Sequence, residues 1–133
     1  MIASLVAATA AAVIAAAPAS PPTVQVQHWV NPSGSVQVRT ASCGAKLCGW
    51  ITWASAEAIA DAREGGVPQV VRLQLLQGYE PVGPGRWRGR VFVPDWNRTF
   101  SSTITQVAPD RLKISGCVVG GFICKSQIWT IAR

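Results

Sequence analysis

Short segments of alternating or β-branched residues fill most of the chain after its first twenty positions. Turn residues such as Asn, Pro, Gly and Asp separate them, a pattern typical of an all-β domain. The alternation predicts eight strands, at 23–30, 35–40, 48–53, 70–76, 86–93, 99–107, 111–119 and 122–131. Sequential antiparallel strands have exposed edges that closure removes, so we expect a small up-and-down, lipocalin-like β-barrel, with an open β-sandwich as the alternative.

One interval between the third and fourth predicted strands, 54–63, has helical character instead. Ser55 can serve as its N-cap, Glu57 and Asp61 are acidic, and Gly65-Gly66 provides a stop. We expect a short helix that packs as a lid or plug on one end of the sheet.

The first residues have a different pattern, because 2–17 is an apolar stretch broken only by Ser4 and Thr9. Its length suits a secretory signal better than a bilayer span, although no Lys or Arg precedes it. We predict a signal peptide over 1–19 with cleavage after Ala19, a linker and strand start over 20–28, and one barrel domain over 29–133. The mature protein is then periplasmic or secreted; the alternative is an uncleaved anchor.

Composition supports one small domain, since 133 residues leave no room for a multidomain enzyme. The 49% hydrophobic content is inflated by the leader. All 12 Lys and Arg and all 6 Asp and Glu follow residue 19, so the net charge of +6 belongs to the mature domain. Export makes nucleic acid an unexpected partner in spite of this basic balance.

The four cysteines fall in two close pairs, Cys43 with Cys48 and Cys117 with Cys124. An even count in a small exported domain predicts disulfides. A two-residue turn at Gly120-Gly121 would place Cys117 opposite Cys124, whereas only proximity supports the first pair, because Ala-Lys is poor turn chemistry. Another pairing and a four-thiolate zinc site remain alternatives, although the spacings are not those of usual zinc knuckles.

Several motifs together resemble the bacterial exported family called the domain of unknown function 2147. They are the block Cys43-Gly44-Ala45-Lys46-Leu47-Cys48-Gly49, the segment Gly85-Arg86-Trp87-Arg88-Gly89, the turn Val93-Pro94-Asp95, and the ending Cys124-Lys125-Ser126-Gln127-Ile128-Trp129-Thr130. The likeness runs from about Trp29 to the C-terminus. It implies a small, exported, lipocalin-like barrel, and it carries over no activity or cofactor.

The chain departs from that family pattern at both ends. The related barrels open with Gly-x-Trp, but Gln27-His28-Trp29 stands here, so the close backbone approach that glycine permits is in doubt. The family's closing Trp-Thr-Arg reads Trp129-Thr130-Ile131, and the cation that would cap the first tryptophan is missing unless Arg133 replaces it.

Six tryptophans lie on the predicted strands or the turns that join them: Trp29, Trp50, Trp53, Trp87, Trp96 and Trp129. We expect core packing for most of them, with Trp29 and Trp129 as a pair on strands that meet in a closed barrel. Lining of a ligand cavity is the alternative, for which Trp87 and Trp129 are the candidates. If alternation holds in the last hairpin, Lys125 and Gln127 share the inward face of Trp129 and could fix the polar end of a ligand; a bulge after Cys124 would turn them outward.

A second candidate surface is basic. Arg86, Arg88 and Arg90 alternate on the face of their strand opposite Trp87 and could contact an anionic lipid or polysaccharide; a merely solvated exterior is the alternative. Trp96 is expected at an exposed turn, where it could touch a partner.

Candidate catalytic chemistry is sparse. His28 is the only histidine and has no nucleophile at motif spacing, and the acidic residues are scattered through helix and turns. We therefore predict a protein that is not an enzyme and has no cofactor. Two functions stay open: binding of a small apolar or amphipathic molecule in the lumen, and a packed barrel that contacts an anionic envelope component.

Overall fold

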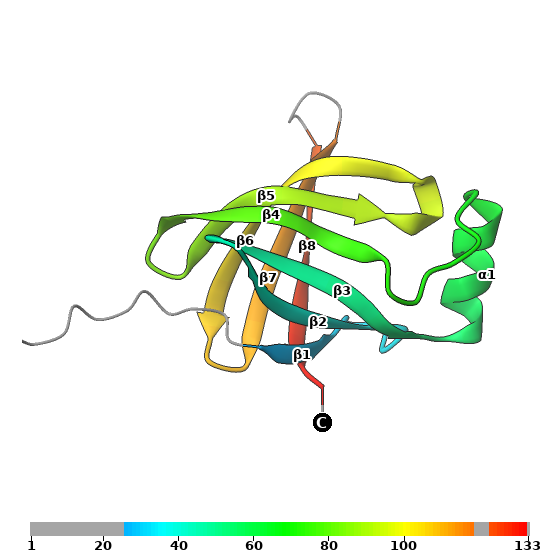
Figure 1. The fold of residues 1–133 in the computed structure, drawn as a ribbon, viewed down its shortest axis with the longest axis horizontal. Coiled ribbons are helices and arrows are strands. Elements are labelled where there is room, and N and C mark those ends of the chain that lie inside the picture. Colours follow the sequence, from blue (N-terminus) through cyan, green and yellow to red (C-terminus); the bar gives the residue numbers. More distant parts are fainter. Residues whose placement is uncertain (1–25, 119–122, 133) are drawn as a thin grey trace, which may run out of the picture.

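A computed structural model describes residues 26–118 and 123–132 of the chain. The predicted signal peptide, the Gly120-Gly121 turn and Arg133 lie outside the described residues. Eight antiparallel strands form a closed barrel in chain order (Figure 1). They are β1 (Gln27–Val30), β2 (Val36–Cys43), β3 (Lys46–Ala54), β4 (Gln74–Gly83), β5 (Arg86–Val93), β6 (Arg98–Ala108), β7 (Arg111–Val118) and β8 (Ile123–Ile131).

The prediction of an up-and-down barrel is confirmed. Each strand pairs with the next, and β1 closes the ring against β8 through Trp29 opposite Ile131 and Val30 opposite Thr130. Closure buries an apolar interior that includes Trp29, Ile104 and Leu112. The alternative of an open sandwich is therefore excluded.

Strand β4 differs most from its prediction, since it spans 74–83 instead of 70–76. Val70 is buried, but it belongs to a connection in which Arg72 has a φ of 77°. The chain turns at Arg72 instead of continuing as a strand. Glycine and proline usually mark turns, but Gly78 and Pro81 lie within β4, at positions where its pairing with β5 shifts register. Irregular pairing lets a strand accept such residues because the ladder is already interrupted at those positions.

The predicted helix is present as α1 (Ala56–Glu64), and the Ser55 hydroxyl accepts a hydrogen bond of 3.1 Å from Ala58 N. Ala62 is fully buried against the core, while Ala58 and Ile59 pack on it in part. The helix lies at one end of the barrel, beside the connections that follow β3 (Figure 1). A short 3₁₀ helix, η1 (Pro94–Trp96), packs next to it. No helix among the described residues has the length and apolarity needed to cross a membrane.

Two disulfides join the predicted pairs, Cys43 with Cys48 and Cys117 with Cys124, so zinc ligation by four thiolates is excluded. Cys117 and Cys124 are direct partners across β7 and β8, as the hairpin prediction required. The first pair is different, because Cys43 stands opposite Lys46. The turn of that hairpin is Gly44-Ala45, with Gly44 at a φ of 70°, which glycine adopts without strain.

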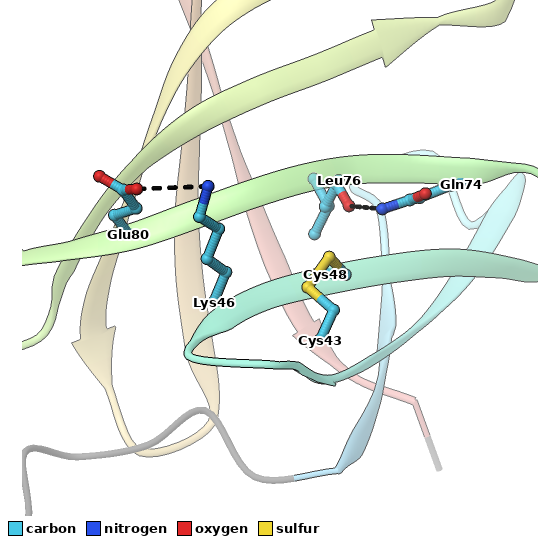
Figure 2. Close-up of a disulfide and its surroundings, with 6 residues drawn as sticks. All are labelled: Cys43, Lys46, Cys48, Gln74, Leu76 and Glu80. Atoms are coloured by element: carbon cyan, nitrogen blue, oxygen red, sulfur yellow. Dashed lines mark hydrogen bonds and ion pairs between the residues drawn. A yellow bond between two sulfur atoms is a disulfide. The ribbon is translucent and has the colours of Figure 1, made fainter.

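Figure 2 shows this disulfide beside β4. Lys46, next to the turn, forms an ion pair of 3.3 Å with Glu80 of β4. Both side chains are largely exposed, so the pair contributes little stability, and the hairpin is held mainly by its covalent link and its ladder.

The six tryptophans differ in burial: three are buried, Trp50 is half-buried, and Trp53 and Trp96 are exposed. Trp29, Trp87 and Trp129 are buried in the core, and Trp29 donates a hydrogen bond of 3.0 Å to the Thr40 hydroxyl. Trp53 is 46% exposed, so the core packing expected for most of the tryptophans does not extend to it. A register shift between Gln37 and Val38, on the paired strand, changes the alternation at this end of β3, where Ala54 takes the inward position.

Candidate binding site

The inner wall of β5 to β8 is built from rows of residues that stand opposite one another on successive strands. Directly opposite residues point to the same face of an antiparallel sheet. The Ile104 row consists of Trp87, Ile104, Ile114 and Gln127, and the Ser102 row consists of Gly89, Ser102, Gly116 and Lys125. Because the side chains of the first three members of the Ile104 row are buried, both rows face the interior.

The members of both rows are buried or half-buried on β5, β6 and β7 but exposed on β8. Ile114 and Ser102 are buried, Gly116 is half-buried, and Gln127 and Lys125 at the ends of the rows are exposed. Their neighbour Ile123, on the same face, is 51% exposed. Inward-facing side chains are accessible here because residues 123–129 of β8 pair with β7, and the described pairs with β1 begin only at Thr130. We call this stretch, 123–129, the open edge.

The sequence at the end of β1 explains the open edge. β1 has four residues against nine in β8, and it stops at Val30 (Figure 1). The Asn31 side chain accepts hydrogen bonds from Ser35 N at 2.9 Å and Val36 N at 3.0 Å, which turns the chain back into β2. An Asn-Pro start of this kind is a strong turn signal. The edge of β8 that faces β1 therefore has no described partner strand over residues 123–129.

The predicted lumenal residues occupy two environments. Trp87 and Trp129 are buried, opposite Ile104 and Leu112 respectively. Lys125 and Gln127 lie on the inward face, as alternation predicted, with no bulge that reverses them, but they are exposed at the open edge. On the inward face of β8, buried Trp129 is therefore followed by two accessible polar side chains, those of Gln127 and Lys125. We call the buried residues Trp87, Ile104 and Trp129 the packed floor.

Two buried residues at this wall, Tyr79 of the neighbouring strand β4 and Ser102 of β6, were missed by sequence reasoning. Tyr79 is 0% exposed, and its ring lies over Gly89, where a Cβ would come 2.7 Å from the Tyr79 Cγ. Glycine at 89 therefore makes the space that the ring fills. Alternation could not identify Tyr79 because the sequence pattern ends the fourth strand at Leu76.

The Tyr79 hydroxyl is a buried polar group without a hydrogen-bond partner of standard geometry among the described residues. Burial raises the pKa of the Tyr79 phenol above its ordinary range, and the nearby Ser102 hydroxyl lowers it in part. Ser102 itself donates its proton to Ser115 O at 2.6 Å. Nearly all buried polar groups in proteins are hydrogen-bonded, so the Tyr79 phenol, whose nearest polar neighbour is the Ser102 hydroxyl, is an exception by standard geometry.

The predicted basic residues lie on the opposite side of the wall. Arg86, Arg88 and Arg90 are exposed on the outer face of β5, opposite Thr105, Thr103 and Ser101 of β6. This outer row does not meet the inner rows, so the two candidate surfaces are separate. Trp96 is 54% exposed in η1 and makes an edge-to-face contact of 5.8 Å with Phe100. His28 is exposed on β1.

Comparison with solved structures gives one match that supports the fold. The structure resembles protein HP1028 from Helicobacter pylori, described as belonging to the lipocalin family, with a TM-score of 0.59. The match covers 84% of this chain and 85% of that one, at 12% sequence identity. Likeness at this identity shows a shared lipocalin-like barrel. The comparison with curated proteins finds no significant match.

Sequence and fold agree on the family. The model of the family described as "Uncharacterized protein conserved in bacteria (DUF2147)" matches residues 28–131, which is nearly the whole barrel. The two disulfides fit a protein that works outside the cytoplasm. The chain belongs to the DUF2147 family of bacterial proteins.

Proposed function

We propose that this protein binds a small apolar or amphipathic molecule against the inner wall of its barrel, at the open edge of β8. One observation carries the proposal: side chains of the inward face that a fully closed barrel would bury are accessible here. Ile123 adds exposed apolar surface at the open edge, and Val91 and Phe100, which pair with each other on the inward face of β5 and β6, are half-buried. Accessible apolar surface with a few polar groups is the usual character of a small-molecule site.

The lipocalin-like fold supports the same proposal. So does the arrangement of buried apolar residues beside the exposed residues of the open edge. Trp87 and Ile104 are buried and packed before any ligand binds, and side chains that are already ordered lose little conformational entropy on binding. Each methylene group removed from water contributes about 0.8 kcal/mol. A chain of about ten carbons is therefore a suitable probe. The role proposed is binding, without catalysis.

Export completes the proposal. The apolar segment 2–17, the Ala-x-Ala patterns before Ser20 and the disulfides all support a secreted or periplasmic protein that is cleaved after Ala19. N-terminal sequencing of the protein recovered from the producing cells tests this, since a start at Ser20 is expected. A start at Met1 would contradict cleavage.

Binding is tested by titrating the mature protein with 1-decanol and following its intrinsic tryptophan fluorescence. A saturable change is expected, because Trp87 and Trp129 line the proposed wall. Native mass spectrometry of protein purified from its own host provides the second measurement and should show a bound molecule of defined mass. The absence of saturable binding by decanol, decanoate and decylamine alike would refute the proposed function.

The outer arginines support a second candidate, contact with an anionic component of the cell envelope. Arg86, Arg88 and Arg90 have no ion pair with any described residue, and Glu80, which stands opposite Arg88, contacts Lys46 instead. Sedimentation with phosphatidylglycerol vesicles tests this function. Replacement of all three arginines by Gln should abolish sedimentation at low salt, and binding that is unchanged would exclude this surface.

A further inference from the structure

We infer that the outer face of β5 binds a linear acidic polysaccharide, whose carboxylates lie along Arg86, Arg88 and Arg90. We call these three residues the arginine row. The inference rests on the second candidate function, contact with an anionic envelope component, and names the chemical class of that component. It is independent of ligand binding at the open edge, because the arginine row and the inner wall lie on opposite faces of the sheet.

The arginine row is evenly spaced, because the ladder between β5 and β6 is regular. The residue pairs from Arg86 with Thr105 to Val93 with Arg98 follow one another without a register shift. Alternate residues of such a strand share a face and lie about 7 Å apart along it. The strand therefore presents three cationic side chains at a constant interval, which fits a ligand whose own charges repeat along a chain.

The arginine row has no acidic partner among the described residues. Glu80 of β4 stands opposite Arg88, but its carboxylate lies 3.3 Å from the Lys46 ammonium (Figure 2). Gln77, which stands opposite Arg90, is uncharged. A guanidinium binds a carboxylate through two parallel hydrogen bonds, so each exposed arginine of the row can hold one carboxylate of a ligand.

Hydroxyl groups accompany the arginines on β6. Each arginine has a Thr or Ser directly opposite it, in the order Thr105, Thr103 and Ser101. Ser101 is exposed, and the two threonines are half-buried. Opposite side chains on antiparallel strands have Cβ atoms about 5 Å apart, so one unit of a ligand can contact a guanidinium and a hydroxyl together. An acidic sugar carries the matching groups, a carboxylate for the guanidinium and hydroxyls that donate and accept hydrogen bonds.

The same face suits a lipid bilayer less well. Proteins that lie on anionic membranes combine cations with apolar side chains that enter the headgroup region. The β6 positions opposite the arginine row are polar, and the next positions on β7 are Lys113, Ser115 and the disulfide-bonded Cys117. A cationic face with neighbouring hydroxyls therefore favours a hydrated polymer over a membrane.

Repetition of the contacts determines how tightly such a polymer binds. A single exposed ion pair contributes little free energy, because water and salt screen it. When successive carboxylates belong to one chain, the second and third contacts become intramolecular, and the overall affinity rises without any new kind of contact. Binding should therefore depend strongly on the length of the chain and weaken as salt is added.

The test titrates the mature protein with polygalacturonate, with monomeric galacturonate and with neutral dextran, at pH 7.5 and low salt. Polygalacturonate is expected to bind at least about tenfold more tightly per sugar unit than galacturonate, and dextran is expected not to bind. Equal binding of polymer and monomer per sugar unit would overturn the inference, as would binding of dextran as tight as that of polygalacturonate.

Sedimentation with phosphatidylglycerol vesicles separates the inference from the function on which it rests. Vesicle binding without polygalacturonate binding would overturn the inference and leave the second candidate function standing. Absence of both would refute the second candidate function as well.

Matched variants then assign polymer binding to the arginine row. Replacement of the three arginines of the row by Gln should weaken polygalacturonate binding by at least about tenfold. The control removes the same charge from the net +6 by replacing three other exposed arginines with Gln, namely Arg39, Arg63 and Arg72. The control variant should bind within about threefold of the natural protein. Equal losses in the two variants would show that only net charge attracts the polymer, and the inference would be wrong.

A measurement on the natural protein locates the polymer without any substitution. Backbone amide resonances should shift on addition of polygalacturonate mainly in β5 and β6, around Arg88 and Thr103, which are paired. Shifts concentrated on other strands would overturn the inference even if the arginine variants bound poorly.

Discussion

The indole Nε1 of Trp129 donates a hydrogen bond of 3.1 Å to Oε1 of Gln127. The two residues are two positions apart on one face of β8, and Trp129 is 4% exposed whereas Gln127 is exposed. The bond therefore links the packed floor of the barrel to the open edge. It also fixes the direction of the Gln127 amide, which would otherwise be free to rotate at the open edge.

Replacement of Gln127 by Leu should destabilise the protein by about 1 kcal/mol, because the Trp129 indole loses its acceptor. The same change should weaken the binding of an amphipathic probe, since the open edge loses its oriented amide. Urea unfolding gives the first quantity and fluorescence titration the second. Gln127→Glu, which keeps an acceptor oxygen, is the control and should retain most of the stability; equal stability of the Leu variant and the natural protein would show that the bond contributes nothing.

The disulfide between Cys117 and Cys124 should stabilise the fold mainly by restricting the unfolded chain. Its sequence separation of 7 implies that Cys117→Ser with Cys124→Ser costs about 2 to 3 kcal/mol, measured by urea unfolding without reductant. Titration of the denatured, unreduced protein should find no reactive thiol. Four reactive thiols would contradict the disulfide pairing.

Gly89→Ala should destabilise the barrel by about 2 kcal/mol or more, because the added Cβ would collide with the Tyr79 ring and lie 2.8 Å from Gln77 O. The Gln77 backbone and the packed Tyr79 ring cannot move away without disturbing their own contacts. Gly83→Ala is the matched control, since nothing lies within 4 Å of a Cβ there. Thermal unfolding of the two variants should differ clearly, and equal midpoints would show that the Tyr79 ring is not packed on Gly89.

Alkaline pH should destabilise the protein through Tyr79. Burial raises the folded-state pKa of this phenol above the unfolded value of 10.0, so above that pH the unfolded chain loses a proton that the folded chain keeps. Stability is then complete below the unfolded pKa and falls as the pH rises, by at most about 1.4 kcal/mol per pH unit. Urea unfolding between pH 9 and 11 (about one unit either side of an ordinary tyrosine pKa) measures this slope. Tyr79→Phe should show a shallower slope; identical slopes would mean that Tyr79 titrates normally.

The sequence was sufficient to predict the barrel, the helix with its Ser55 cap and the Cys117–Cys124 disulfide, because alternation, turn residues and hairpin geometry are local signals. The Cys43–Cys48 disulfide was predicted from proximity in the sequence alone. The inward face of Lys125 and Gln127 followed from the same alternation. The open edge was not predictable, since it depends on how far β1 runs beside a strand about a hundred residues later. Tyr79 was missed because register shifts around Gly78 and Pro81 break the alternation in β4.

The central claim, that the inner wall at the open edge is the ligand surface, is tested most directly by nuclear magnetic resonance of the indole N–H groups during a decanoate titration. The Trp129 indole and the Gln127 side-chain amide should shift saturably and together, because a ligand at the open edge perturbs their shared hydrogen bond. The Trp29 indole, bonded to Thr40, should stay nearly fixed. Shifts confined to the exposed Trp53 or Trp96, with Trp129 unmoved, would contradict the claim.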